Sequence, residues 1–170
     1  MKTRLLPFMI GCLLMALPGA RIIAQDSGKT SKKTASQTEL AANIHSRTYL
    51  FQAQSATPMS GRVIQLTGGY EVKVKNDTVV VYLPYYGRAF QAPLDPTKGP
   101  LDFTSTQFKY TLTERKKGGW NILITPSDGG DVRQLSFTVS ENGYTSLQVT
   151  SNNRQPISFY GTLGAIKKRK

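Results

Sequence analysis

A dense run of aromatic side chains with one arginine is the part of this sequence whose residue types most suggest binding chemistry. The run reads VVVYLPYYGRAFQAP and spans residues 79–93. Its rings offer apolar contact, and its arginine favours an anionic or carbonyl-bearing partner. Two interpretations stay open: an aromatic lip beside a ligand cleft, or a strand that leaves its sheet through a corner plugged by tyrosine. The residues that would carry binding are Tyr82, Tyr85, Tyr86, Arg88 and Phe90.

The proline in this run predicts how the chain turns. Pro84 cannot donate to a sheet ladder, so we expect the strand to end or bulge there. In an extended chain Tyr85 and Tyr86 point to opposite sides, so one faces the core and the other is partly exposed. We expect Arg88 to lie over a tyrosine ring. A long loop with three prolines, over residues 91–102, then passes close to this corner.

The remaining ionisable residues argue against catalysis. His45 is the single histidine, and its place at the edge of the folded region predicts an exposed helix end rather than a triad member or zinc ligand. The carboxylates fall in turns or on wet strand faces without a marked pair. Asp128 and Asp131 could bracket calcium, but turn residues explain them better. We therefore expect no enzyme, no catalytic residue, no metal and no cofactor.

The first residues have the composition of an export signal. A basic start, with Lys2 and Arg4, precedes the apolar run 5–17, and a small residue, Ala24, stands at the expected cleavage position. The alternatives are an uncleaved anchor, which the prolines at the ends of this run oppose, and a lipoprotein attached at Cys12, which the apolar residues after it oppose. Because Cys12 is the single cysteine, a mature chain would have no disulfide and must rely on an apolar core.

The charge of the folded region is only mildly basic. The whole chain of 170 residues has a formal net charge of +12. Residues 47–166 contain 12 basic and 8 acidic side chains, a balance of +4, because many of the other cations lie near the two ends. We therefore expect no nucleic-acid partner. The sequence predicts a signal peptide over 1–24, a disordered linker over 25–38, a β domain over 39–164 and a basic tail over 165–170.

Twofold alternation dominates the domain. After a short helix over 39–45, apolar residues alternate with polar ones in segment after segment, and the segments are separated by turns too short for crossover helices. The turn signals include Asn76-Asp77 and Asn142-Gly143. The strand over 78–83 is apolar on both faces and is therefore expected to be a central strand of the sheet. The pattern predicts a mainly β fold: one antiparallel meander of about eight or nine strands, curled into a lipocalin-like barrel or a two-layer sheet.

Several short motifs resemble one family. They are Phe51-x-Ala53, Gly69-Tyr70, Tyr82-Leu83-Pro84-Tyr85-Tyr86-Gly87-Arg88, Asp102-Phe103, and Asn153-Arg154 through Ser158-Phe159-x-Gly161. Together they resemble domain-of-unknown-function family 4251, exported proteins of Gram-negative bacteria, over roughly residues 40–164. The resemblance implies export and a single β-rich domain. It implies no activity and brings no catalytic residues.

Two functional hypotheses follow. The first is a non-enzymatic domain, periplasmic or secreted, that binds a small or extended ligand near the Leu-Pro-Tyr-Tyr-Gly-Arg segment. The second is a structural or protein-interaction domain of the cell envelope that uses a sheet edge or face. The partner is accordingly an unknown small molecule, a peptide or an envelope protein, and the mature chain is expected to have no transmembrane segment.

Overall fold

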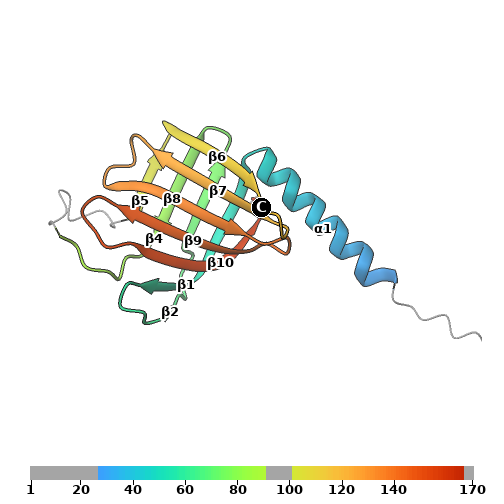
Figure 1. Cartoon of the computed structure of the whole chain (residues 1–170), viewed down its shortest axis with the longest axis horizontal. Helices are drawn as coiled ribbons and strands as arrows, with labels where there is room; N and C mark the ends of the chain where they lie inside the picture. Colours follow the sequence, from blue (N-terminus) through green and yellow to red (C-terminus); the bar gives the residue numbers. More distant parts are fainter. Residues whose placement is uncertain (1–26, 91–100, 167–170) are drawn as a thin grey trace, which may run out of the picture.

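The computed structural model describes residues 27–90 and 101–166 as one helix followed by an all-β body (Figure 1). The elements are α1 (Ser27–His45), β1 (Thr48–Pro58), β2 (Ile64–Gln65), β3 (Glu71–Lys75), β4 (Thr78–Leu83), β5 (Leu101–Ser105), β6 (Phe108–Glu114), β7 (Trp120–Pro126), β8 (Val132–Val139), β9 (Tyr144–Ser151) and β10 (Ile157–Gly164).

All the strand pairs are antiparallel, and they form one sheet with the order β5-β4-β3-β1-β10-β9-β8-β7-β6, while β2 pairs with β1 off this path. The chain thus makes two meanders, and the pairing of β1 with β10 joins them. The two ends of the order, β5 and β6, are connected through Thr106 and Gln107. The sheet therefore curls until its halves face each other in a nearly closed barrel (Figure 1). The predicted antiparallel β fold with an N-terminal helix is confirmed.

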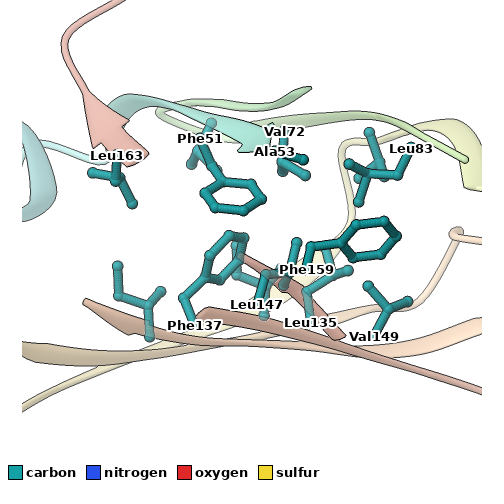
Figure 2. Close-up of a cluster of buried hydrophobic side chains, with 14 of the residues drawn as sticks. Phe51, Ala53, Val72, Leu83, Leu135, Phe137, Leu147, Val149, Phe159 and Leu163 are labelled. Carbon is teal, nitrogen blue, oxygen red and sulfur yellow. The ribbon is translucent and has the colours of Figure 1, made fainter. Parts of the chain in front are cut away.

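Alternate side chains of the strands fill the space between the two halves. Figure 2 shows residues of β1, β3 and β4 pointing towards residues of β8, β9 and β10. The ring of Phe51 meets the edge of Phe137 at 5.8 Å, and Tyr49 meets the same ring at 6.5 Å. Burying each large apolar side chain stabilises the fold by about 1.5–3 kcal/mol. Twofold alternation therefore buries one face of most strands and leaves the other face outside, while in β6 the inward side chains are only partly buried.

The segment before the barrel differs from the prediction. α1 begins at Ser27, whereas the sequence predicts a disordered linker over 25–38 and a helix only over 39–45. The polar stretch lacks apolar periodicity, which is why a pattern analysis treats it as a spacer. Leu40 and Ile44 are buried against the barrel and anchor the last turns of the helix. The predicted leader over 1–24 and most of the basic tail lie outside the described residues.

The guanidinium of Arg47 and the hydroxyls of Tyr49 and Tyr110 join the end of α1 to β6, which is at one end of the sheet order. Arg47 takes a positive φ of 52° and so redirects the chain from the helix into β1. Its guanidinium lies 4.7 Å from the centroid of the Tyr110 ring. The Tyr49 hydroxyl donates to that of Tyr110 at 3.4 Å. Burial, and secondarily the neighbouring Tyr110, raises the pKa of Tyr49 well above its ordinary value.

One strand prediction was confirmed, and one loop prediction was wrong. β4 was expected to be a central strand, and it lies between β3 and β5. Its outer face is partly exposed, with Val80 at 37% and Tyr82 at 50%. β4 is internal to the sheet order, and its second face lies on the outside of the barrel rather than against another layer. The loop predicted over 91–102 runs too far, because β5 begins at Leu101. Residues 91–100 lie outside the described residues.

A β-bulge marks the junction of β1 and β10. The register skips one residue of β1, Gln54, opposite Gly161 and Tyr160 of β10. A Cβ on Gly161 would overlap the carbonyl oxygen of Gln52, so only glycine lets the two backbones approach this closely. Gly161 therefore marks a close approach of the two backbones beside a bulge.

We predict that Gly161→Ala destabilises the domain by about 3 kcal/mol, because the new methyl group forces apart the strands that join the two meanders. Urea unfolding followed by circular dichroism measures the change. Gly164→Ala is the matched control in the same strand, where an added Cβ meets nothing within 4 Å. Its stability should stay within about 0.5 kcal/mol of the parent. Equal losses in the two variants would contradict the close-approach explanation.

Candidate ligand-binding surface

Tyr85 of the predicted aromatic site holds the corner together. Its hydroxyl donates to the carbonyl oxygens of Arg88 and Gln155, at 2.9 and 3.0 Å. The backbone of Gln155 donates in turn to the carbonyl of Arg88 at 3.1 Å, and Phe90 donates to the carbonyl of Asn153 at 2.8 Å. Tyr85 is partly buried and packs against the core. These contacts fit the interpretation of a corner plugged by tyrosine.

The cation beside this corner comes from another part of the chain. Arg154, not Arg88, lies over the Tyr85 ring, 5.8 Å from its centroid. Arg154 is buried and its Nε lies 3.5 Å from a carboxylate oxygen of Asp131. Asp131 also accepts a hydrogen bond from the backbone of Asn153 at 2.9 Å. The stacked arginine therefore ties the turn after β7 to the corner, and the prediction for Arg88 was wrong.

The other predicted site residues are exposed, and they are spread over two elements. Tyr82 lies on the outer face of β4 and stacks on Tyr70, with ring centroids 5.5 Å apart. Tyr86, Arg88 and Phe90 lie on the segment after β4 and are all exposed. The structure thus separates the role of Tyr85 from that of its neighbours, and ligand binding at this corner stays a prediction.

Asp128 serves the junction of β5 and β6. One carboxylate oxygen accepts a hydrogen bond from the Ser105 hydroxyl, and the other accepts from the backbone of Thr106 at 3.0 Å and of Gln107 at 3.2 Å. The Ser105 hydroxyl, followed by the Thr106 amide, lowers the pKa of Asp128. Within the described residues no three His, Cys, Asp or Glu side chains gather as a metal site would require.

A groove over β9 and β10 brings together side chains that the sequence analysis did not select. Tyr144 and Tyr160 are 68% and 51% exposed. Tyr160 pairs with Ser146 and Tyr144 pairs with Thr162, so the two tyrosines are diagonal neighbours on one outer face. Between and beside them lies a hollow of about 330 Å³. Its volume falls within the range of about 300–1,000 Å³ typical of ligand sites.

Four polar residues reach this groove from outside the β9–β10 pair: Gln54, Arg115, Thr138 and Ser140. Gln54 is exposed at the bulge, where the skipped register places it beside Tyr160. Arg115 comes from the turn between β6 and β7, which is closed by a hydrogen bond from its own amide to the carbonyl of Gly119 at 3.0 Å. The groove therefore combines two aromatic rings, an amide and a guanidinium.

A second hollow continues the groove across the sheet. It measures about 370 Å³ and lies over β6, β7 and β8. Thr138 lines both hollows, so they meet at β8. Hydroxyl and amide side chains make up most of its lining: Thr111, Thr113, Asn121, Ser136 and Thr138. We call the two hollows together the outer track. It crosses five strands. Most of its lining residues have hydrogen-bonding side chains, while most of its exposed lining surface is apolar.

Comparison with known proteins agrees with this architecture. The sequence model of the family described as Domain of unknown function (DUF4251) matches residues 31–163. The chain belongs to the DUF4251 family. Its fold is similar to that of a DUF4251 family protein from Bacteroides eggerthii DSM 20697, a crystal structure with a TM-score of 0.59 and 16% sequence identity, over 79% of this chain and 91% of that chain. No curated protein matches the chain.

The resemblance noted from the Leu-Pro-Tyr-Tyr-Gly-Arg segment is thereby confirmed. At 16% identity the solved DUF4251 structure shows the fold alone. Across 27–90 and 101–166 no helix is both long enough and apolar enough to cross a bilayer.

The groove of this DUF4251 domain was missed because its rings, amide and guanidinium come from four separate stretches of sequence. Gln54, Arg115, Tyr144 and Tyr160 are between 16 and 61 positions from their neighbours in this series. The sequence did contain one indication of the groove. Tyr144 and Tyr160 fall at solvent-facing positions of strands with alternating polarity, where an aromatic ring is not needed for the core. Apart from the glycine in the partner strand, the sequence does not indicate the bulge that presents Gln54.

We predict that Tyr85→Phe lowers the free energy of unfolding by about 1 kcal/mol, because the corner loses the hydroxyl shared by two carbonyls. Tyr86→Phe, at the exposed neighbouring position, should leave the stability unchanged within error. Urea unfolding of both variants measures the difference. A Tyr86 variant as destabilised as the Tyr85 variant would contradict the assignment of the corner plug.

We predict a pH-dependent effect for Asp128→Ala. A lowered folded-state pKa contributes stability that is fully present above the ordinary aspartate value of 3.8 and is lost as the pH falls through the lowered value. The variant should therefore melt below the parent at pH 7, and the gap should narrow below pH 3.8. Calorimetry between pH 7 and pH 2 tests this, with the exposed Asp102→Ala as control. A gap that stays constant with pH would contradict it.

Proposed function

We propose that this protein is a non-enzymatic exported domain that binds an extended carbohydrate chain along the outer track. The observation that carries the proposal is the position of the two hollows, which are neighbours on one outer face because Thr138 lines both, and which together cross five strands. A chain of sugars is long, rich in hydroxyl groups and flat-faced, and so matches a surface of hydroxyl, amide and tyrosine side chains.

The packed core of the barrel supports a ligand site on the outer surface of the sheet. Rings and aliphatic side chains from both halves of the sheet meet in the middle of the barrel (Figure 2). A ligand inside would have to displace the Phe51–Phe137 contact, which is 5.8 Å between centroids. The outer face needs no such rearrangement, because side chains there already stand in solvent.

Across β7, β8 and β9 the backbone of the track is not available to a ligand. The amides and carbonyls of β7, β8 and β9 are committed to ladders on both sides of each strand. Recognition on this face therefore depends on side chains, which suits a hydroxyl-rich ligand better than a peptide that adds backbone hydrogen bonds. We place the binding residues here rather than at the corner, where Tyr85 is engaged in structural contacts.

The ionisable groups support a binding rather than a catalytic role. Asp128 and Asp131 accept hydrogen bonds from neighbouring turns. His45 is exposed at the end of α1, where its Nε2 lies 3.9 Å from an oxygen of Glu114. None of these four lines the outer track. The leader-like residues 1–24 support placement in the periplasm or outside the cell, where polysaccharides are exposed.

Strand addition is the second candidate function. β6 ends the sheet order and pairs only with β7 in the described part of the chain. Together with the packed interior, this edge favours an extended peptide of an envelope protein as the alternative partner. The two candidates differ in the surface they use, since one needs the face of β7–β10 and the other needs the edge of β6.

Titration of the ¹⁵N-labelled exported chain with oligosaccharides tests the proposal. The probes are tetrasaccharides of glucose, N-acetylglucosamine and galacturonate. We expect at least one of them to shift the amides of Thr138, Ser146 and their neighbours on the track, while the amides of the 85–90 corner stay in place. Shifts with none of the probes, or shifts confined to β6, would contradict the proposal.

A blocking substitution supplies the control. Thr138→Trp fills the point that the two hollows share and should abolish the shifts. Thr104→Trp places the same indole on the exposed face of β5, away from the track, and should leave binding intact. Both positions face outward, so both variants should fold. Equal loss of binding in the two variants would contradict a site on the track.

A further inference from the structure

The groove over β9 and β10 has a positively charged side chain, which the second hollow of the track lacks. Within the described part of the chain, Arg115 is the one charged residue that lines the groove, and the second hollow is lined by uncharged residues alone. Among the described residues the ion pairs are His45–Glu114, Lys73–Glu71 and Arg154–Asp131, so Arg115 takes part in none. Its guanidinium is exposed and retains its donors for a ligand.

Aromatic rings stand beside this cation. The flat faces of sugar rings carry C–H groups that pack on tyrosine, and the two rings of the groove offer 68% and 51% of their residues' surface to solvent. Tyr144 is fixed by the turn before it, where Gly143 takes a positive φ of 81° and Ser140 donates to the Tyr144 carbonyl at 2.9 Å. The platform is therefore set by the hairpin rather than by a free loop.

Further hydrogen-bonding groups surround the rings. Gln54 presents an amide from the bulge, and Thr138 and Ser146 present hydroxyls from paired positions of β8 and β9. The Ser140 hydroxyl oxygen is buried at the rim and makes no hydrogen bond to any described residue. The groove thus offers both donors and acceptors around one ring-sized platform.

Resting on the proposed function, we infer that the groove binds a sugar that bears a carboxylate, such as a uronic acid. The sugar ring lies on Tyr144 and Tyr160, its carboxylate meets the Arg115 guanidinium, and its hydroxyls bond to Gln54 and the neighbouring hydroxyls. A single guanidinium matches a single negative charge and the planar fork of a carboxylate. A phosphate, with a charge of about −1.5 to −2, would leave excess charge in a groove with one cation.

Charge removal from the ligand separates this inference from general attraction to a basic protein. The probes are tetragalacturonate and its methyl ester, which has the same rings and no charge. We expect the acid to bind about tenfold more tightly than the ester in isothermal titration at 0.15 M NaCl, because a charge-assisted pair is lost. The difference should shrink as the salt concentration rises, since Arg115 is exposed.

Two arginine variants provide the matched comparison. Arg115→Gln should bind acid and ester with equal affinity. Arg133→Gln removes the same charge from an exposed position of β8 that does not line the groove, and it should keep the tenfold preference. Tyr144→Ala should weaken both probes about fivefold and leave the preference unchanged, because the rings act on the sugar face.

The outcomes distinguish the two proposals. If the ester binds the track as tightly as the acid, the carboxylate inference is wrong while the proposed function stands. If the preference falls equally in the Arg115 and Arg133 variants, the effect is diffuse attraction and the inference is again wrong. If neither probe nor any neutral tetrasaccharide shifts the track amides, the proposed function itself has failed.

Discussion

The close approach of β1 to β10 is the constraint on which the rest of this structure depends. The chain folds as two local meanders, and only this pairing converts them into one sheet that curls around a core. The approach is possible because Gly161 has no side chain opposite Gln52. The extra residue that the bulge absorbs, Gln54, is turned outward beside Tyr160 as a consequence. One backbone requirement thus sets both the closure of the barrel and the edge of the groove.

Closure of the barrel decides where a ligand has room. The aromatic contacts of Phe51 and Tyr49 with Phe137 show that the two halves meet side chain to side chain, as in a packed small barrel. The interior is therefore used for stability. The outer faces of β6 to β10 carry threonine, serine, glutamine and asparagine, which satisfy no core requirement. A binding surface on that face costs the fold little, because the residues that form it alternate with those that are sealed inside.

The alternation of apolar and polar residues was enough to predict the strands, their antiparallel pairing and the hairpin turns, because each depends on neighbours in the sequence. It failed where tertiary contacts decide. β5 follows a proline-containing segment, and its strand state depends on pairing with β4. The polar first half of α1 has no periodicity to detect. Within the candidate site, the roles of Tyr85 and Arg88 depended on residue 154 and its neighbours, about 70 positions away, which no local pattern can reveal.

The same reasoning explains why the aromatic-rich corner and the groove differ in character, although both expose tyrosine. At the corner the hydroxyl of Tyr85 is hydrogen-bonded to backbone carbonyls, and its ring is covered by a buried arginine. Both groups therefore serve the fold and are not available to a ligand. At the groove the rings of Tyr144 and Tyr160 are exposed, and a guanidinium outside the ion pairs of the described residues stands beside them. Folding uses the first set and leaves the second available. Recognition is therefore expected where side chains with binding chemistry are positioned by rigid strands but are not required to hold those strands in place.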